Sequence, residues 1–177
     1  MGGACCGLVL GGDAMRFGLM GLLVVLLCFV PVLSQAEGRR VALVIGNGDH
    51  ARAVDLPNPG NDAVDMGAAL SGLGFDLVGG RAHVDVTERQ MLRLLREFSA
   101  ALRPGDTALF YFAGHGMEQD GDNWLLPVDD GEIRYREDVP DYAVGLKSLR
   151  SQLEERRPGI TLVILDACRD MPLASRV

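Results

Sequence analysis

The strongest constraint on the fold is an alternation along the chain between continuous apolar runs and segments whose apolar residues recur at helical spacing. A short, unbroken apolar run is typical of a strand that is buried on both faces, as in a parallel sheet. Strands that alternate with helices predict an α/β domain in which a mostly parallel sheet is covered by helices on both faces, with right-handed crossovers. The predicted strands are residues 41–45, 75–78, 107–112 and 160–165, the predicted helices are 59–73, 87–102 and 146–153, and residues 124–128 are predicted to be extended.

Local signals support the helix boundaries. Pro59 can begin the first helix, because the fixed φ of proline suits the first helical position. Thr87–Gln90 has the form of a capping box, which opens the second helix. Pro104–Gly105 and Pro158–Gly159 end the second and third helices.

Length and charge exclude several classes of protein. The 177 residues suffice for one domain with a core that can fold without disulfides. A hydrophobic content of 48% excludes a disordered or low-complexity chain. The formal net charge of −7 argues against binding to nucleic acid, because neutralising phosphates requires a basic surface.

The amino-terminal segment has the pattern of a secretory signal peptide. Arg16 precedes an uncharged run from Phe17 to Leu33, and small residues stand at the −3 and −1 positions of a cut after Ala36. The alternative is an uncleaved membrane anchor, although the run is short for a spanning helix and Pro31 interrupts it.

We therefore expect residues 1–36 to be a signal peptide, with Met15 as an alternative start, and residues 37–177 to be the mature domain. The domain is then exported to the periplasm or the extracellular space, or stays anchored to the membrane if the signal is not cleaved.

Removal of the signal peptide leaves one cysteine. Cys5, Cys6 and Cys28 precede the expected cut, and Cys168 follows it. A single thiol cannot form an internal disulfide, so Cys168 is either a packed apolar residue or a reactive thiol.

Polar residues follow two of the predicted strands directly. Ala113–Gly116 comes after the third strand, and Asp166–Asp170 comes after the fourth. Ligands of such folds bind at the carboxyl ends of the strands, near the point where the strand order reverses. If the two strands are neighbours, about 4.8 Å apart, His115 and Cys168 can face one another across this edge.

A cysteine beside a histidine suits nucleophilic catalysis. The thiolate attacks, and the histidine holds the ion pair and later protonates a leaving amine. The backbone N–H groups of Gly116 and Cys168 can stabilise the oxyanion. Either side chain alone is more often structural, but both together, after successive strands, favour catalysis.

Four segments resemble the large-subunit region of bacterial caspase-like and metacaspase-like cysteine peptidases. They are Val41–Asn47, Asn61–Ala63, Phe110–Met117 and Leu165–Asp170, and the resemblance covers residues 41–172. It implies a caspase-like three-layer sandwich. The caspase pattern is Gln-Ala-Cys-x-Gly with a histidine about 50 residues upstream.

The resemblance also implies a role for each matching residue. His115 looks like the general acid and base, Cys168 like the nucleophile, and Gly116 like part of the oxyanion hole. Asp166 stands where caspases have glutamine and resembles the metacaspase acid that lines the substrate pocket, and Asp62 resembles the second acid of that pocket. Two carboxylates select a cation, which implies cleavage after Arg or Lys. Without the resemblance, Asp62 alone would be interpreted as an acid that interacts with the helix dipole in the first turn after Pro59. Asp166 alone would likewise be interpreted as an acid that caps a loop.

Metal binding is weakly indicated. His50 and His83 lack the spacing of zinc ligands to each other or to His115. The acids in Glu118–Asp122 and Asp129–Asp130 could bind calcium, as in some metacaspases, but they have no EF-hand pattern and are more often solvated loops. We expect that no cofactor is required, with calcium as an option.

The resembled family continues into a smaller portion with two further strands and one wall of the substrate pocket. We expect the domain at residues 37–177 to lack these small-subunit strands, which leaves strand 160–165 at an exposed sheet edge. Three explanations are open for the expected lack of these strands: a truncated gene, a missing partner chain, or a domain that has lost activity and only binds. A second chain or a second copy could complete the edge.

The expected function is therefore a cysteine endopeptidase that hydrolyses protein or peptide substrates after Arg or Lys through a Cys168–His115 dyad. The first alternative is an inactive module of the same fold that binds peptides or dimerises. A weaker alternative is a small-molecule binder that uses the same strand ends. No stable membrane span is expected after signal cleavage.

Overall fold

A computed structural model describes residues 38–167, so the expected signal peptide and Cys168 lie outside the described residues. None of the helices within residues 38–167 combines the length and the apolar character needed to cross a bilayer. The strands are β1 Arg40–Gly46, β2 Phe75–Leu77, β3 His83–Val84, β4 Thr107–Gly114, β5 Gly116–Gln119, β6 Asp122–Leu125, β7 Val144–Gly145 and β8 Ile160–Ala167. The α-helices are α2 Pro59–Gly72, α3 Glu88–Ala101, α4 Val139–Tyr142 and α5 Leu146–Glu155.

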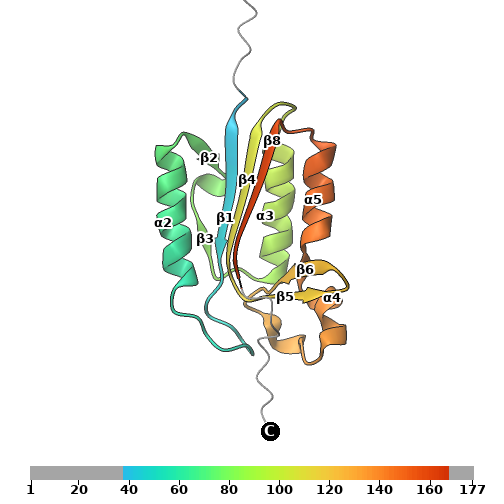
Figure 1. Ribbon diagram of the computed structural model, residues 1–177. Helices are drawn as coiled ribbons and strands as arrows, with labels where there is room; N and C mark the ends of the chain where they lie inside the picture. The colour runs from blue at the N-terminus through green and yellow to red at the C-terminus, as the bar shows by residue number, and fades with distance from the viewer. Residues whose placement is uncertain (1–37, 168–177) are drawn as a thin grey trace, which may run out of the picture. The chain divides into compact units, whose positions relative to one another are not determined.

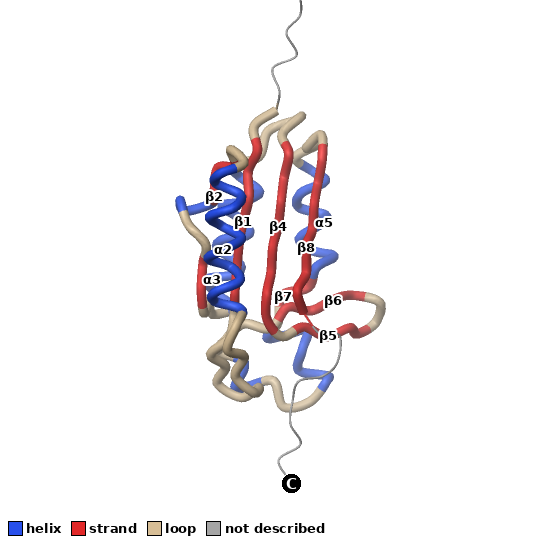
Figure 2. Tube along the Cα trace, turned by 60° about the vertical axis from the view of Figure 1, so that its left-hand side comes forward, coloured by secondary structure: helices blue, strands red, loops and turns tan. Residues whose placement is uncertain are grey.

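The main sheet is parallel, as the sequence predicts. Its strands lie in the order β2-β1-β4-β8, and the short β3 also pairs with β1 (Figures 1 and 2). The chain passes from β1 to β2 on one side and then returns to β4 on the other, so the strand order reverses between β1 and β4. The carboxyl ends of these two strands therefore form the edge at which ligands of open α/β sheets bind.

Helices cover both faces of the sheet, which confirms the predicted three layers. Helix α2 packs on one face, and α3 and α5 pack on the other (Figure 1). Side chains alternate between the faces of each strand, so each strand contributes to two cores. The core under α2 includes Ala42, Val44, Leu109 and Tyr111. The core under α3 and α5 includes Leu43, Ile45, Phe98, Phe110, Phe112 and Leu149.

The predicted helices begin where their local signals place them. The hydroxyl of Thr87 accepts a hydrogen bond from the Gln90 amide, and the Gln90 side chain accepts one from the Thr87 amide, which completes the capping box of α3. Pro59 is the first residue of α2. A Cβ on Gly46 would overlap the Pro59 carbonyl oxygen, so the glycine at the end of β1 lets the first turn of α2 approach the sheet.

A smaller antiparallel sheet lies at the carboxyl end of the main one (Figure 2). Its strands have the order β5-β6-β7, and a satellite core beneath it includes Met117, Leu126 and Ile133. The sequence predicts only an extended piece at residues 124–128, whereas β6 ends at Leu125 and β5, β7 and α4 are not predicted. Elements of two to four residues are too short to show a hydrophobic period, and tertiary packing decides them.

Strand β8 lies at the end of the sheet order within residues 38–167, in line with the expected edge position. One face of β8 exposes Ile160, Leu162 and Ile164, while Val163 and Leu165 on the other face pack against the core.

Asp106 joins the amino-terminal ends of three strands. Its carboxylate accepts hydrogen bonds from the Arg39 amide at 2.9 Å, the Arg39 guanidinium at 2.8 Å and the Arg103 amide at 2.9 Å. Its carbonyl oxygen accepts from the amide of Gly159, just before β8. Burial alone would raise the pKa of Asp106, but the Arg103 and Arg39 donors outweigh it and lower the pKa below its usual value.

We predict that Asp106→Asn lowers the free energy of unfolding by about 2–3 kcal/mol at pH 7, because charge-assisted hydrogen bonds to three donor groups are weakened. Since the native pKa is depressed, the stabilisation is present above about pH 4 and is lost as pH falls below it. Urea unfolding between pH 7 and pH 3 measures both effects. Glu97→Gln, in the exposed Arg93–Glu97 pair, is the control and should change stability by less than about 0.5 kcal/mol.

Candidate active site

Strands β4 and β8 are hydrogen-bonded neighbours, as the candidate dyad requires. Their register pairs Thr107 with Ile160 at one end and Gly114 with Ala167 at the other. Gly114 directly precedes His115, and Ala167 directly precedes Cys168. The structure therefore brings the two chain segments that carry the expected dyad to the same point of the sheet edge, although Cys168 itself lies outside the described residues.

The backbone at Gly114 determines where His115 lies. Gly114 has a φ of 149°, which favours glycine, and a Cβ there would lie 2.9 Å from the Asn47 carbonyl oxygen. The chain turns at this residue from β4 into β5, and His115 occupies the turn.

His115 is largely buried and makes one hydrogen bond to the backbone. Its Nε2 lies 2.7 Å from the carbonyl oxygen of Val54. A carbonyl only accepts, so Nε2 carries a hydrogen and donates it. In the neutral ring this leaves Nδ1 as the nitrogen that can accept a proton.

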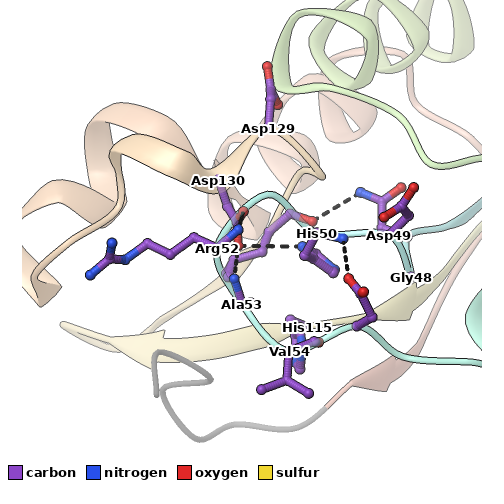
Figure 3. Close-up of polar contacts among 12 residues, drawn as sticks. Gly48, Asp49, His50, Arg52, Ala53, Val54, His115, Asp129 and Asp130 are labelled. Carbon is purple, nitrogen blue, oxygen red and sulfur yellow. Dashed lines mark hydrogen bonds and ion pairs between the residues drawn. The ribbon is translucent and has the colours of Figure 1, made fainter. Parts of the chain in front are cut away.

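Asp130 holds the loop that supplies this carbonyl. Its carboxylate accepts hydrogen bonds from the amides of Arg52 at 2.8 Å and Ala53 at 2.9 Å, immediately before Val54 (Figure 3). The Asp130 side chain is fully buried. Two charge-assisted bonds to successive amides fix the backbone beside His115.

Further backbone hydrogen bonds close the same loop. The Leu56 amide donates to the Gly48 carbonyl at 2.9 Å, and the Ala51 amide donates to the Val128 carbonyl at 2.9 Å. Residues 48–56 contain no helix or strand, but these hydrogen bonds hold the loop in one conformation.

A second imidazole packs against His115. The ring centroids of His50 and His115 are 4.9 Å apart and the rings are tilted by 54° (Figure 3). His50 Nδ1 lies 3.5 Å from Oδ2 of Asp130, and both side chains are fully buried. At this distance the contact is an ion pair when His50 is protonated rather than a close hydrogen bond.

The surroundings favour neutral His115. Burial is the main cause that lowers the pKa of His115, and the nearby His50 lowers it further, whereas the Val54 carbonyl and the Asp130 charge raise it. For Asp130, burial alone would raise the pKa, but the His50 contact and the Ala53 and Arg52 amides lower it below its usual value. A neutral histidine beside an ionised aspartate can act as a base near neutral pH.

Asn47 holds together the backbone around this site. It is fully buried at the end of β1, and its amide nitrogen donates to the carbonyls of Val86 at 3.2 Å and Leu126 at 3.0 Å. Its side-chain oxygen accepts from the Val86 amide at 3.0 Å, and its backbone amide donates to the Ala113 carbonyl at 2.9 Å.

Gly116 begins β5 directly after His115. It pairs with Leu125 of β6 and is buried. Together with Leu165 and Ala167 it lines a cavity of about 110 Å³. Gly116 therefore lies beside the end of β8, where an oxyanion donor for Cys168 is expected.

Asp62 and Asp166 line one cavity of about 440 Å³, together with residues of the 56–59 segment and the ends of β4 and β8. Asp62 comes from the first turn of α2, so it also has the helix-dipole position. Burial raises the pKa of Tyr111, and the charges of Asp166 and then Asp62 raise it further. The structure thus brings the two predicted acids together.

Three of the acids considered for calcium, Asp122, Asp129 and Asp130, accept hydrogen bonds from backbone amides. Asp129 accepts from the Glu88 amide at 2.8 Å at the start of α3, and Asp122 accepts from the Lys147 amide at 3.0 Å. Within residues 38–167, no three His, Cys, Asp or Glu side chains are grouped so that they could hold a metal ion. His83 bonds to the Val78 carbonyl, apart from the other two histidines.

Sequence reasoning missed the Val54 carbonyl altogether, and it considered His50 and Asp130 only as metal ligands, not as neighbours of His115. A carbonyl acceptor has no sequence signal, because every residue carries one. His50 and His115 lie on different loops, and their spacing along the chain gives no indication that the rings are in contact. A buried acid in an acid-rich loop has the same sequence pattern as a solvated one.

Known proteins resemble this chain in sequence and in fold. Residues 39–176 match the family model described as caspase domain. Human mucosa-associated lymphoid tissue lymphoma translocation protein 1 is 31% identical over 130 residues, and the mouse homologue has the same values. The aligned region is 73% of this chain and only 15% of these relatives.

A crystal structure of a protein from Geobacter sulfurreducens has the same fold. It superposes with a TM-score of 0.56 at 21% identity, over 73% of this chain and 50% of that chain. Together with the family match, this establishes a caspase-like α/β fold for the present chain.

We predict that Asn47→Ala lowers the free energy of unfolding by about 2–4 kcal/mol, because it leaves buried backbone groups of Val86 and Leu126 without partners. Chemical denaturation measures the loss. Asn58→Ala is the matched control, since the Asn58 side chain makes no capping hydrogen bond at the start of α2. Equal effects of the two substitutions would contradict the bridging role of Asn47.

Proposed function

This chain belongs to the caspase-domain family of cysteine peptidases, and from this premise we propose that it is an endopeptidase with Cys168 as nucleophile and His115 as general acid and base. The observation that carries the proposal is the pairing of Gly114 with Ala167, the residues that precede His115 and Cys168. Because the whole relatives are much longer than this chain, their own activities are not transferred to it.

The proposed reaction begins with proton transfer from the Cys168 thiol to Nδ1 of His115. Nε2 is engaged by the Val54 carbonyl, so the ring is held in the tautomer that accepts at Nδ1. The thiolate then attacks the scissile carbonyl carbon, and the backbone N–H groups of Gly116 and Cys168 stabilise the oxyanion.

Collapse of the tetrahedral intermediate breaks the C–N bond and leaves a thioester on Cys168. Nδ1 of His115 gives its proton to the departing amine. A water molecule then transfers a proton to His115 and attacks the thioester, and release of the acid restores the thiol. The lowered pKa of His115 supports this role, since the ring is neutral and able to accept a proton near pH 7.

The cavity between Asp62 and Asp166 supports cleavage after a basic residue. Two carboxylates on one cavity can bind a guanidinium or an ammonium, and arginine matches them best because its planar group presents several donors. The exposed edge at β8 is the position at which we propose that a second chain or copy adds to the sheet.

The 177-residue chain is to be assayed with fluorogenic peptides that place Arg, Lys or Asp before the scissile bond, with and without calcium. We expect cleavage after Arg and Lys, and a fall of at least about a thousandfold in kcat/KM for Cys168→Ala and for His115→Ala. Cleavage only after Asp would keep the dyad and contradict the acidic pocket. A folded chain that cleaves none of the peptides would contradict the endopeptidase proposal and favour the binding module.

Asp62→Asn tests the pocket separately. We expect kcat/KM for Arg peptides to fall about 10- to 100-fold, because a charge-assisted pair with the substrate is lost. Asp65→Asn, an exposed acid on the same helix that does not line the cavity, is the matched control and should leave kcat/KM unchanged. Equal effects of the two substitutions would argue for general electrostatics in place of a pocket.

A further inference from the structure

Two buried groups beside His115 have no part in the dyad. His50 packs against His115 with ring centroids 4.9 Å apart and the rings tilted by 54°, and Oδ2 of Asp130 lies 3.5 Å from His50 Nδ1. Both side chains are inaccessible to solvent. A buried imidazole next to a buried carboxylate is costly to maintain unless the arrangement is compensated by hydrogen bonds or by function.

We propose that His50 and Asp130 are positioning residues for His115: Asp130 fixes the loop whose Val54 carbonyl orients the His115 ring, and His50, packed against the same ring, opposes its protonation. This inference rests on the proposed role of His115 as acid and base.

The first part of the proposal follows from a continuous chain of contacts. One oxygen of Asp130 accepts from the Arg52 amide and the other from the Ala53 amide. Val54 is the next residue, and its carbonyl accepts from His115 Nε2 at 2.7 Å. The buried carboxylate is thus one residue removed from the carbonyl that sets the tautomer of His115 (Figure 3).

The second part follows from the environment of His50. Among residues 38–167, neither ring nitrogen of His50 has a hydrogen-bond partner, although both are buried. Its Nδ1 lies 3.5 Å from Oδ2 of Asp130, and the ring packs against His115 with centroids 4.9 Å apart. Two imidazolium ions in contact repel each other, so a proton on one ring opposes a proton on the other.

The other acids near His50 and His115 accept hydrogen bonds from backbone amides. Asp55 accepts the backbone amide of His50 at 2.9 Å, and Asp129 accepts at the start of α3. Asp85 accepts the amides at residues 48–49. The Arg52 side chain extends away from both histidines (Figure 3). Within the described residues, His50 and Asp130 are the charged groups that shift the pKa of His115.

The test is a pH titration of the histidine rings by NMR in the full 177-residue chain with Cys168→Ala. Without the thiol no cleavage can occur, so the result does not depend on whether the chain is a peptidase. The sequence has three histidines, and single His→Gln substitutions assign the resonances labelled with ¹³C and ¹⁵N.

We expect His50→Gln to raise the pKa of His115 by about half a unit or more, because a neutral amide replaces a group that can carry positive charge. His83→Gln is the matched control: His83 is also buried but bonds to Val78, and its loss should leave the His115 titration unchanged. An unchanged pKa of His115 in His50→Gln would overturn the proposed effect of His50 on His115.

Asp130→Asn tests the positioning role. We expect the ¹⁵N shifts of neutral His115 to move from a single Nε2–H tautomer to a mixture, because the amide no longer holds the loop with two charged acceptors. A retained single tautomer would overturn this role.

If Asp130→Asn does not fold, Asp130→Glu keeps the charge but displaces the acceptors. It should shift the tautomer balance in the same direction, and a balance identical to that of the parent chain would likewise overturn the role.

Discussion

The parallel pairing of β4 between β1 and β8 is the constraint on which the rest of the structure depends. All three strands are in register along their length, so their carboxyl ends reach the same edge at Gly46, Gly114 and Ala167. The apolar side chains of β4 are buried on both faces, which makes a shift in register costly, because a slip of one residue would exchange the two cores. The position of His115 is a consequence of that register.

Irregular backbone surrounds the site, and buried polar side chains hold it in place. Asn47 bridges the turn before α3 and the end of the small sheet, and Asp130 binds the loop before Val54. Regular structure supplies no partners for the amides and carbonyls of such loops, so these side chains supply them. The site therefore owes its rigidity to a few fully buried hydrogen-bonding groups as much as to the sheet.

Two different electrostatic environments lie at the carboxyl edge of the sheet, an acidic cavity and the buried surroundings of His115. On the α2 side, Asp62 and Asp166 line one acidic cavity, and the charges of both acids raise the pKa of Tyr111. Next to the turn after β4, burial and a second imidazole keep His115 neutral. An acidic cavity attracts a basic side chain of a substrate, and a neutral imidazole can take a proton from a thiol. Membership in a cysteine peptidase family accords with this division.

The sequence by itself determined the layered fold, the order of the main strands and helices, and the positions of His115 and Cys168 in the chain directly after the third and fourth predicted strands. Hydrophobic periods, capping residues and strand ends are local, so these features can be recognised without coordinates. The neighbouring positions of β4 and β8, the shared cavity of Asp62 and Asp166, and the contacts of His115 with Val54 and His50 depended on tertiary structure. Such contacts join residues far apart in the chain, and only the packing of whole elements brings their atoms within reach of one another.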